Sequence, residues 1–155
     1  MSSVTTWEID SHSSAQTEEL ASKVGRNLRG SEVIELVSDL GGGKTTFTRG
    51  LVRGAGSDER VRSPTFTLSS EYKTSKFTIA HFDFYRLGEA GIVADELAEV
   101  VGDTQYVVVV EWGEIVHDVL PADRLTIHFL RTGDELRKIT FEYPNSLAYL
   151  LKGLE

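Results

Sequence analysis

The sequence predicts an α/β fold built on one mixed sheet, with parallel strands around a glycine-rich loop and antiparallel strands elsewhere. Two near-continuous apolar runs, 32–37 and 107–110, are typical of strands buried on both faces in the centre of a parallel sheet. The glycine-rich loop follows the first run and precedes a segment with helical spacing. Alternating runs on either side of Gly133-Asp134 indicate an antiparallel hairpin.

The first part of the chain predicts a strand followed by a helix. Residues 4–9 alternate as in a short strand, and Ser13 with Gln16 resembles a capping box. Four apolar residues then share one helical face, and Gly30 can end the helix; they are Leu20, Ala21, Val24 and Leu28.

After the glycine loop, Phe47, Leu51 and Val52 predict the inner side of a helix that ends near Gly54 and Gly56. The remaining expected elements are two strands containing Phe66, Leu68, Phe77 and Ile79 and joined by a polar turn at 73–76, a helix over 88–101, a short helix stopped by Pro121, hairpin strands at 125–129 and 137–141, and a last helix over 145–152.

The composition limits the possible classes of protein. A chain of 155 residues with 40% hydrophobic residues suits one soluble domain, which we expect to cover residues 1–155. The net charge of −8 argues against a large nucleic-acid interface, so any RNA is expected to be reached through a partner or a small local patch. Cysteine is absent, and the first residues lack a signal sequence, so the cytoplasm is the expected location.

The stretch 38–46 has the features of a phosphate-binding loop. The backbone N–H groups of Asp39, Leu40, Gly41, Gly42 and Gly43 would face a phosphate, together with a helix N-terminus and the Lys44 charge. Thr45 would offer a hydroxyl to a phosphate-bound Mg²⁺. Ser38 stands where the usual pattern has glycine, and the alternative is a glycine-rich turn that happens to contain a lysine.

Two carboxylates follow apolar strands, and ligands of open α/β sheets lie at the carboxyl ends of the strands. Asp83 follows Phe82, and Glu111 follows four valines. Such carboxylates hold Mg²⁺ or orient an attacking water in P-loop proteins. The alternatives are a helix N-cap for Asp83 and a strand-terminating charge for Glu111.

Other candidate residues have weaker support from the sequence. Ser63, Pro64 and Thr65 could form a switch segment that responds to the γ-phosphate. Trp112 could pack over a nucleotide or fill the core. The four histidines, His12, His81, His117 and His128, show no metal-binding spacing and are interpreted as ordinary surface or core residues, and Arg49 and Arg53 as solvated helix charges.

Three functions remain open on these residues alone. The guanine signature Asn-Lys-x-Asp is absent, which favours ATP over GTP, and no second substrate pocket is evident. The chain is therefore interpreted as an ATPase that acts on another protein. The alternatives are a nucleotide-dependent binding module, in which hydrolysis is incidental, and a small-molecule kinase.

Taken together, four motifs resemble the TsaE family of bacterial P-loop ATPases, which act in forming threonylcarbamoyladenosine in tRNA. In chain order they are DLGGGKTTFTRG at 39–50, SPTFT at 63–67, HFDFYRL at 81–87 and Glu111-Trp112. The resemblance implies a P-loop NTPase-like, three-layer α/β fold with a central, mostly parallel sheet and flanking antiparallel strands. It further implies ATP with Mg²⁺, hydrolysis that is slow until TsaD and TsaB bind, and contact with tRNA only through that complex.

The resemblance also implies roles for individual residues. Lys44 and the backbone of 39–43 would hold the phosphates, and Thr45 with Glu111 would ligate Mg²⁺. Positions needed for activity match Asp83 and Thr46, and the tryptophan beside the nucleotide matches Trp112. Ser14 and Arg137 match positions that reach the nucleotide. Ser38 and Gly42 depart from the usual family residues, and Ser38 is expected to alter nucleotide affinity.

Overall fold

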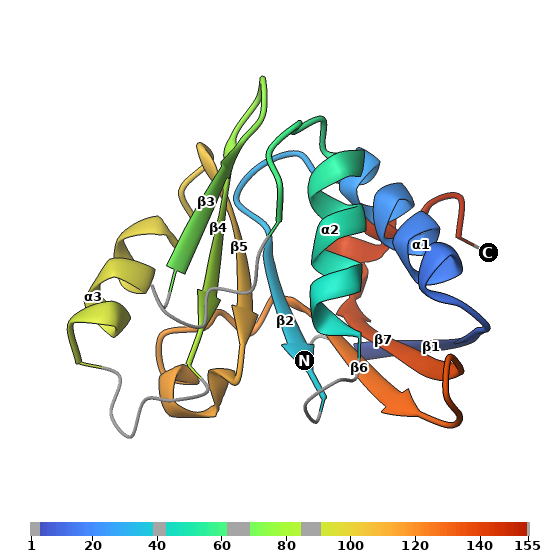
Figure 1. The fold of residues 1–155 in the computed structure, drawn as a ribbon. Helices are drawn as coiled ribbons and strands as arrows, with labels where there is room; N and C mark the ends of the chain where they lie inside the picture. The colour runs from blue at the N-terminus through green and yellow to red at the C-terminus, as the bar shows by residue number, and fades with distance from the viewer. Residues whose placement is uncertain (1–3, 39–42, 62–68, 85–90, 155) are drawn as a thin grey trace.

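The computed structural model describes residues 4–38, 43–61, 69–84 and 91–154, coloured along the chain in Figure 1. Its strands are β1 (Val4–Ser11), β2 (Val33–Val37), β3 (Ser69–Lys73), β4 (Thr78–Asp83), β5 (Tyr106–Glu111), β6 (Leu125–Arg131) and β7 (Arg137–Pro144). Its helices are α1 (Ser14–Asn27), α2 (Lys44–Gly54) and α3 (Gly91–Val100), with 3₁₀ helices η1 (Gly113–Val116) and η2 (Asn145–Leu151).

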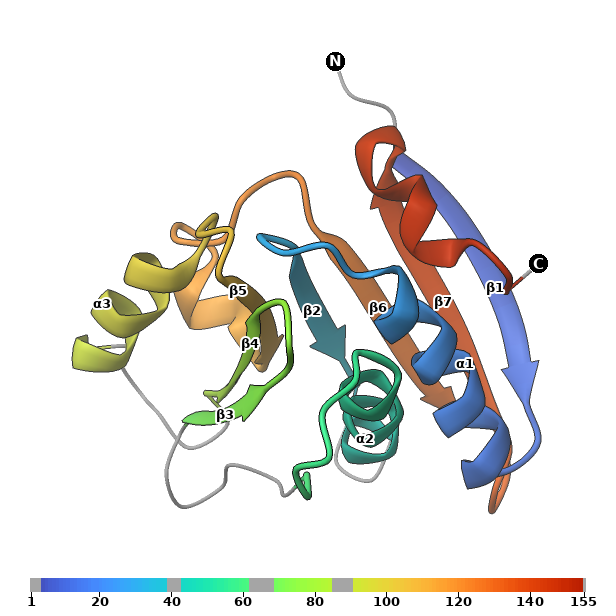
Figure 2. The same cartoon turned by 90° about the horizontal axis from the view of Figure 1, so that it is seen from above.

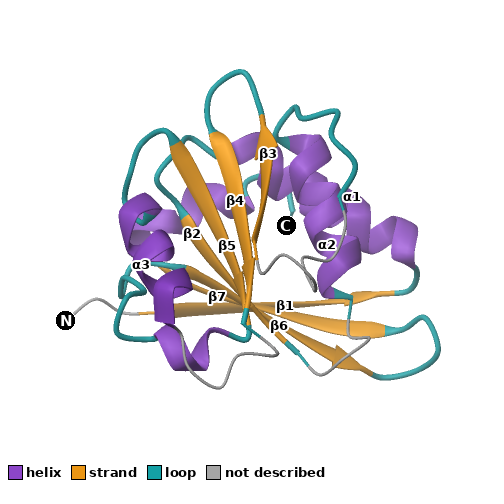
Figure 3. Cartoon of the chain, turned by 60° about the vertical axis from the view of Figure 1, so that its left-hand side comes forward, coloured by secondary structure: helices purple, strands orange, loops and turns teal. Residues whose placement is uncertain are grey.

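The described strands form a seven-stranded sheet in the order β1-β7-β6-β2-β5-β4-β3. The four central strands, β6, β2, β5 and β4, pair in parallel, whereas β1, β7 and β3 join by antiparallel pairing. Figure 3 shows that the strands at the two ends of the sheet run in very different directions because of its strong twist. The predicted α/β fold with a mostly parallel centre and antiparallel flanks is confirmed.

Helices lie on both faces of the sheet. On one face α1 and α2 lie side by side, and their apolar residues, among them Val24, Phe47 and Leu51, share a core with β2, β6 and β7 (Figures 1 and 2). On the other face Leu97 of α3 and Val116 of η1 pack against β4 and β5 in a second core. The centre of the molecule therefore has the expected three layers.

The alternation of side chains along each central strand determines what faces each core. In β2, Ile34 and Leu36 belong to the core beneath α1 and α2, and Val33 belongs to the core beneath α3. In β5, Val107 and Val109 face the first core, and Val108 and Val110 face the second. The apolar runs predicted these two strands because both of their faces are buried.

Glycines allow α1 and α2 to approach closely. A Cβ on Gly50 would lie 2.2 Å from the carbonyl oxygen of Glu18, and one on Gly54 would lie 2.0 Å from that of Ser22. A Cβ on Gly25 of α1 would lie 2.2 Å from the carbonyl oxygen of Leu51. The backbones are thus in contact, and this contact fixes the start of α2 relative to the start of α1.

Several element ends differ from the sequence predictions. Helix α1 ends at Asn27 rather than at Gly30, because Leu28 is extended and buried in the core. Gly30 instead has φ of 117° in the connection to β2, where a Cβ would lie 2.5 Å from the Thr104 carbonyl oxygen. The last predicted helix, 145–152, is the 3₁₀ helix η2. Phe66 and Leu68, expected in a strand, lie outside the described residues.

The described helices differ from a membrane-spanning segment in length and hydropathy. None of them is long and apolar enough to cross a membrane.

Candidate functional site

The first turn of α2 is the centre of the candidate site. Gly43 precedes the helix with φ of 110°, a left-handed conformation that favours glycine. Among the described residues, no side chain caps this turn by a hydrogen bond. The backbone N–H groups of a helix start and the helix dipole both attract an anion, so this turn is suited to bind phosphate.

Lys44 is buried, and its ammonium group lies among polar and aromatic groups. Nζ donates a hydrogen bond to the Ser38 carbonyl oxygen at 3.3 Å and lies 3.8 Å from Oε1 of Glu111. It also lies 4.1 Å from the centre of the Trp112 ring, within the range of a cation–π contact. The structure therefore brings together the predicted residues Lys44, Glu111 and Trp112.

Asp83 and Glu111 end neighbouring parallel strands at the same level. They are Cα partners in the β4–β5 pairing, and both are buried. The backbone continues this pairing beyond the strands, since the Phe84 N–H donates to the Glu111 carbonyl oxygen at 3.0 Å. The structure thus places both predicted carboxylates at the carboxyl edge of the sheet, next to the start of α2.

The donor set fits Mg²⁺ held together with a phosphate. Mg²⁺ in nucleotide sites is usually bound by one or two carboxylates, a hydroxyl and substrate phosphates, with several waters retained. Thr45, half-buried in the first turn of α2, and Glu111 supply a hydroxyl and a carboxylate. No group of three or more His, Asp or Glu side chains gathers for a metal within the described ranges.

Four predicted nucleotide-binding residues, Ser14, Gly43, Thr46 and Arg137, line one small cavity. The cavity has a volume of about 180 Å³, and its lining is completed by Thr17, Asp134 and Glu135. These residues come from α1, the start of α2 and the β6–β7 hairpin. The tight α1–α2 contact therefore places Ser14 beside Thr46, although the two are far apart in the sequence.

Arg137 is fixed by the hairpin strand that it begins. Its Nη1 donates to the carbonyl oxygens of Gly133, Asp134 and Leu136 at 3.3, 3.3 and 3.0 Å. A Cβ on Gly43 would lie 3.9 Å from the Arg137 Nε, so the guanidinium group is close to the phosphate loop. The structure therefore places this positive charge beside Gly43, the residue before α2.

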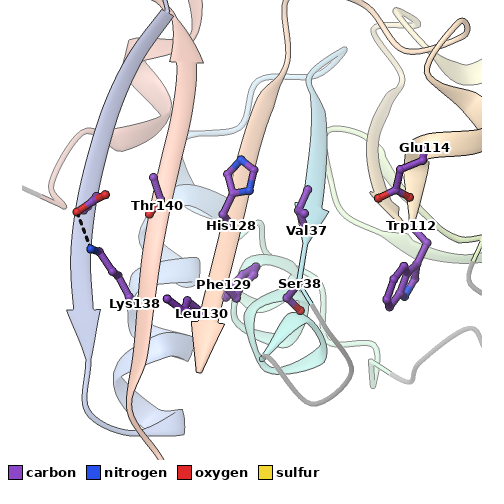
Figure 4. A pocket seen from close by; sticks show the side chains of 10 residues that line it. Val37, Ser38, Trp112, Glu114, His128, Phe129, Leu130, Lys138 and Thr140 are labelled. Atoms are coloured by element: carbon purple, nitrogen blue, oxygen red, sulfur yellow. Dashed lines mark ion pairs between the residues drawn. The ribbon is translucent and has the colours of Figure 1, made fainter. Parts of the chain in front are cut away.

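A larger groove of about 490 Å³ includes Ser38, the residue after β2, in its lining. Ser38 and Trp112 line it together with the face of β2, β6, β7 and β1 that α1 and α2 do not cover. Figure 4 shows Trp112 and Glu114 on one side of the groove, Thr140 and Lys138 on the other, and Val37 with Ser38 between them. Trp112 thus lies apart from the Ser14–Arg137 cavity.

Trp112 has an unusual backbone conformation. Its φ of 57° lies in the left-handed region, which a bulky residue adopts only at some cost in energy. The residue directly follows Glu111 and begins the turn into η1. This local conformation directs the ring toward Lys44 and could not be inferred from residue type.

His81 belongs to the site, although its spacing in the sequence did not indicate this. It is fully buried, and its Nε2 lies 2.5 Å from Oε2 of Glu111. The available signal was its position on β4, since His81 and Asp83 are two residues apart and share a face of the strand. The sequence interpretation left His81 as an ordinary surface or core histidine; the structure buries it, and its contact with Glu111 was not anticipated.

A second unpredicted cluster lies beneath η1 on the opposite face of the sheet. Glu35, buried in β2, accepts a hydrogen bond from Nε of Arg124 at 3.0 Å and lies 3.3 Å from Nε2 of His117. These contacts join the segment after Trp112 to the central strand.

The arginines of α2 are exposed, as their interpretation as solvated helix charges requires, and they also form ion pairs. Arg49 and Arg53 pair with Glu18 of α1 at 3.0 and 3.1 Å. They therefore connect two helices rather than point only into solvent.

Seven predicted site residues lie outside the described residues. They are Asp39, Leu40, Gly41 and Gly42 of the loop and Ser63, Pro64 and Thr65 of the expected switch. Their roles stay predictions from the sequence.

Comparisons with known proteins agree on one family. The sequence profile described as "Threonylcarbamoyl adenosine biosynthesis protein TsaE" matches residues 11–139. The chain is 36% identical over 131 residues to the tRNA threonylcarbamoyladenosine biosynthesis protein TsaE of Bacillus subtilis, covering 81% of this chain and 78% of that protein. It is 38% identical over 130 residues to the protein of the same name from Treponema pallidum, covering 84% and 96% of the two chains.

A solved structure shows the same fold. The crystal structure of Bacillus subtilis YdiB superposes with a TM-score of 0.75 and 30% sequence identity. The match covers 96% of this chain and 93% of that one.

Proposed function

The chain belongs to the TsaE family, and from that premise we propose that it is an ATP-binding, slowly ATP-hydrolysing protein. Its work is in the formation of N6-threonylcarbamoyladenosine in tRNA, the pathway named in its relatives' descriptions. ATP hydrolysis resets a complex of the TsaD and TsaB proteins between turnovers. The tRNA is reached through that complex, which is consistent with the net charge of −8.

One observation supports this proposal most strongly. Lys44 at the start of α2 lies 3.8 Å from Glu111 at the end of β5, with Asp83 beside it on β4. A helix N-terminus, a lysine and two carboxylates at the end of a parallel sheet are the groups that phosphoryl transfer requires. The catalytic contribution of such a site is positioning and charge stabilisation.

Each residue has a proposed role in hydrolysis. Lys44 and the first N–H groups of α2 bind and orient the phosphates, and the Thr45 hydroxyl and the Glu111 carboxylate hold Mg²⁺. Mg²⁺ bound to these two residues would supply positive charge to the phosphate oxygens. Asp83, which is not required for that coordination, accepts a hydrogen bond from the attacking water and orients it. Thr46 and Arg137 contact the nucleotide from the small cavity.

The present contacts of Lys44 explain how a partner could control the reaction. Its ammonium group is shared by the Ser38 carbonyl, Glu111 and Trp112. A phosphate at the start of α2 would compete with these groups for the Lys44 ammonium group, and an exchange would release Oε1 of Glu111 from Lys44. A partner that favours the exchanged arrangement would accelerate hydrolysis, which is the expected effect of TsaD and TsaB.

The direct test is phosphate release from ATP with and without TsaD and TsaB. We expect slow release by the chain alone and clear stimulation by the pair. Asp83→Asn and Glu111→Gln should abolish the stimulated rate, whereas Asp118→Asn, an exposed charge removal after η1, should leave it unchanged. Equal rates with and without the pair, or full activity of both site variants, would reject the proposal.

A further inference from the structure

Glu111 and His81 form a buried pair of side chains. His81 has no exposed surface and Glu111 has 3% of its surface exposed. Nε2 of His81 lies 2.5 Å from Oε2 of Glu111, and Nδ1 has no hydrogen-bond partner among the described residues. An ionised carboxylate only accepts hydrogen bonds, so with Glu111 in that form the Nε2–H of His81 donates to Oε2.

In the pairing of β4 with β5, His81 and Glu111 are not directly opposite each other but diagonal neighbours. His81 is the Cα partner of Val109, whereas Glu111 is the partner of Asp83. The Glu111 side chain therefore leans back along β5 toward His81. Both lie on the face beneath α1 and α2, since Ala80 and Phe82 of β4 belong to the opposite core.

The two carboxylate oxygens of Glu111 have different neighbours. Oε2 is held by His81, and Oε1 lies 3.8 Å from Nζ of Lys44 at the start of α2. A carboxylate held at one oxygen cannot rotate freely, so Oε1 stays directed toward the first turn of α2. This is the place where the proposed function puts Mg²⁺ and the phosphates.

We propose that His81 is a positioning residue that orients Glu111 for metal binding, an inference that rests on the proposed function. Partners that hydrogen-bond a metal ligand orient it, and losing one typically weakens metal binding about 10- to 100-fold. His81 also keeps Glu111 hydrogen-bonded when Lys44 turns to a phosphate. A buried carboxylate without any partner would be costly at that step.

Two conservative variants separate this role from simple packing. The amide nitrogen of glutamine is as many bonds from Cα as Nε2 of histidine, so His81→Gln can still donate to Oε2 of Glu111. The amide nitrogen of asparagine is one bond closer and corresponds to Nδ1, so His81→Asn cannot reach it. Both variants keep a polar amide in the core, which makes their effects on folding comparable.

The measurement is Mn²⁺ binding to the ADP-loaded protein, followed by the loss of the free Mn²⁺ signal in electron paramagnetic resonance. We expect His81→Asn to weaken Mn²⁺ binding about 10- to 100-fold and His81→Gln to retain most of the wild-type affinity. ADP affinity measured in EDTA should be the same in all three proteins, because Lys44 and α2 are intact. His128→Asn is the control, since Nε2 of His128 also lies near a carboxylate oxygen, 3.4 Å from that of Glu142, but on the sheet face that α1 and α2 do not cover.

The outcomes distinguish the inference from the function on which it rests. Equal Mn²⁺ affinities of the asparagine and glutamine variants would overturn the positioning role. If His81→Asn weakened ADP binding in EDTA as much as it weakened Mn²⁺ binding, or lowered the melting temperature, His81 would have a structural role instead. If the wild-type protein bound neither ADP nor Mn²⁺ with ADP, the proposed function itself would fail.

Discussion

Replacing Gly50 with alanine tests how closely α1 and α2 must approach each other. Helix propensity alone predicts a gain, because alanine inside a helix is about 0.5–1 kcal/mol more favourable than glycine. The structure predicts a loss. The new Cβ would lie 2.2 Å from the Glu18 carbonyl oxygen and 2.8 Å from the Glu18 Cα.

The size of the loss follows from these distances. The obstructing atoms are backbone, so the helices must separate by about 1 Å to reach an ordinary contact, and overpacking of this kind costs about 1–3 kcal/mol. Because the obstructing backbone atom is only 2.2 Å away, we take the upper part of that range, about 2–3 kcal/mol, and subtracting the propensity gain leaves a net destabilisation of about 1–2 kcal/mol. For a chain of this size that corresponds to a melting temperature lower by roughly 2–8 °C.

Thermal and urea unfolding measure the effect, and ADP binding measures its consequence for the site. Separation of the helices should also move Ser14 away from Thr46 and weaken ADP binding. Gly56→Ala is the control, because Gly56 has φ of 98° but a Cβ added there would meet no atom within 4 Å, so it reports backbone strain without a clash. A Gly50→Ala protein as stable as wild type, or more stable, would refute the reasoning.

Three further changes follow from single contacts. Burial, and then the hydrogen bond to Glu32 and its charge, raise the pKa of Tyr149, so the folded protein keeps the phenol proton above pH about 10, where the unfolded chain loses it. Stability should therefore fall with rising pH above that value, and Tyr149→Phe should flatten the fall in urea unfolding. Arg124→Leu removes the hydrogen bond from the Arg124 guanidinium group to the buried Glu35 carboxylate. Loss of this charged partner should destabilise the protein by about 3 kcal/mol. Arg137→Ala should weaken ADP binding about tenfold in a calorimetric titration, the value of one charge-assisted hydrogen bond.

Each of these changes has its own control. An unchanged slope of stability against pH in the Tyr149 variant would contradict the first. Because two apolar residues can replace a buried ion pair at little cost, the double variant Glu35→Leu with Arg124→Leu should recover most of the lost stability; no recovery would contradict the second. Arg131→Ala, an exposed arginine of the same hairpin, should leave ADP affinity intact, and an equal loss there would contradict the third.

The sequence predicted the elements whose signals are local. The apolar runs of β2 and β5 are unambiguous because both faces of these strands are buried. Ser13 caps α1 as its spacing suggests, accepting from the Gln16 N–H at 3.1 Å. Gln16 in turn accepts from the His12 N–H at 2.8 Å, one residue before the usual capping-box position.

Other features depend on pairing between distant segments. Nothing local indicates that β1 pairs with β7, at opposite ends of the chain. The 3₁₀ form of η2 was not predicted because periods of 3.0 and 3.6 are hard to distinguish over 7 residues. The contact of His81 with Glu111 depends on the β4–β5 register, which no residue pattern specifies.

The candidate site divides in the same way. Lys44, Asp83 and Glu111 could be predicted because each follows directly from its place at the end of a strand or the start of a helix. Ser14 and Arg137 were supported only by resemblance, and the structure brings them to one cavity through the α1–α2 contact and the hairpin. Local signals thus indicated the groups at the start of α2 and at the ends of β4 and β5 better than the remaining candidate residues.

The central claim is that Lys44 and the carboxylates at the ends of β4 and β5 form one Mg²⁺–ATP site. A calorimetric titration of the chain with a non-hydrolysable ATP analogue, with and without Mg²⁺, tests it most directly. We predict one site per chain, tighter binding with Mg²⁺, and about 100-fold weaker binding by Lys44→Ala, from the loss of a charged hydrogen-bond donor. Binding that is absent, indifferent to Mg²⁺, or unchanged in Lys44→Ala would contradict the claim.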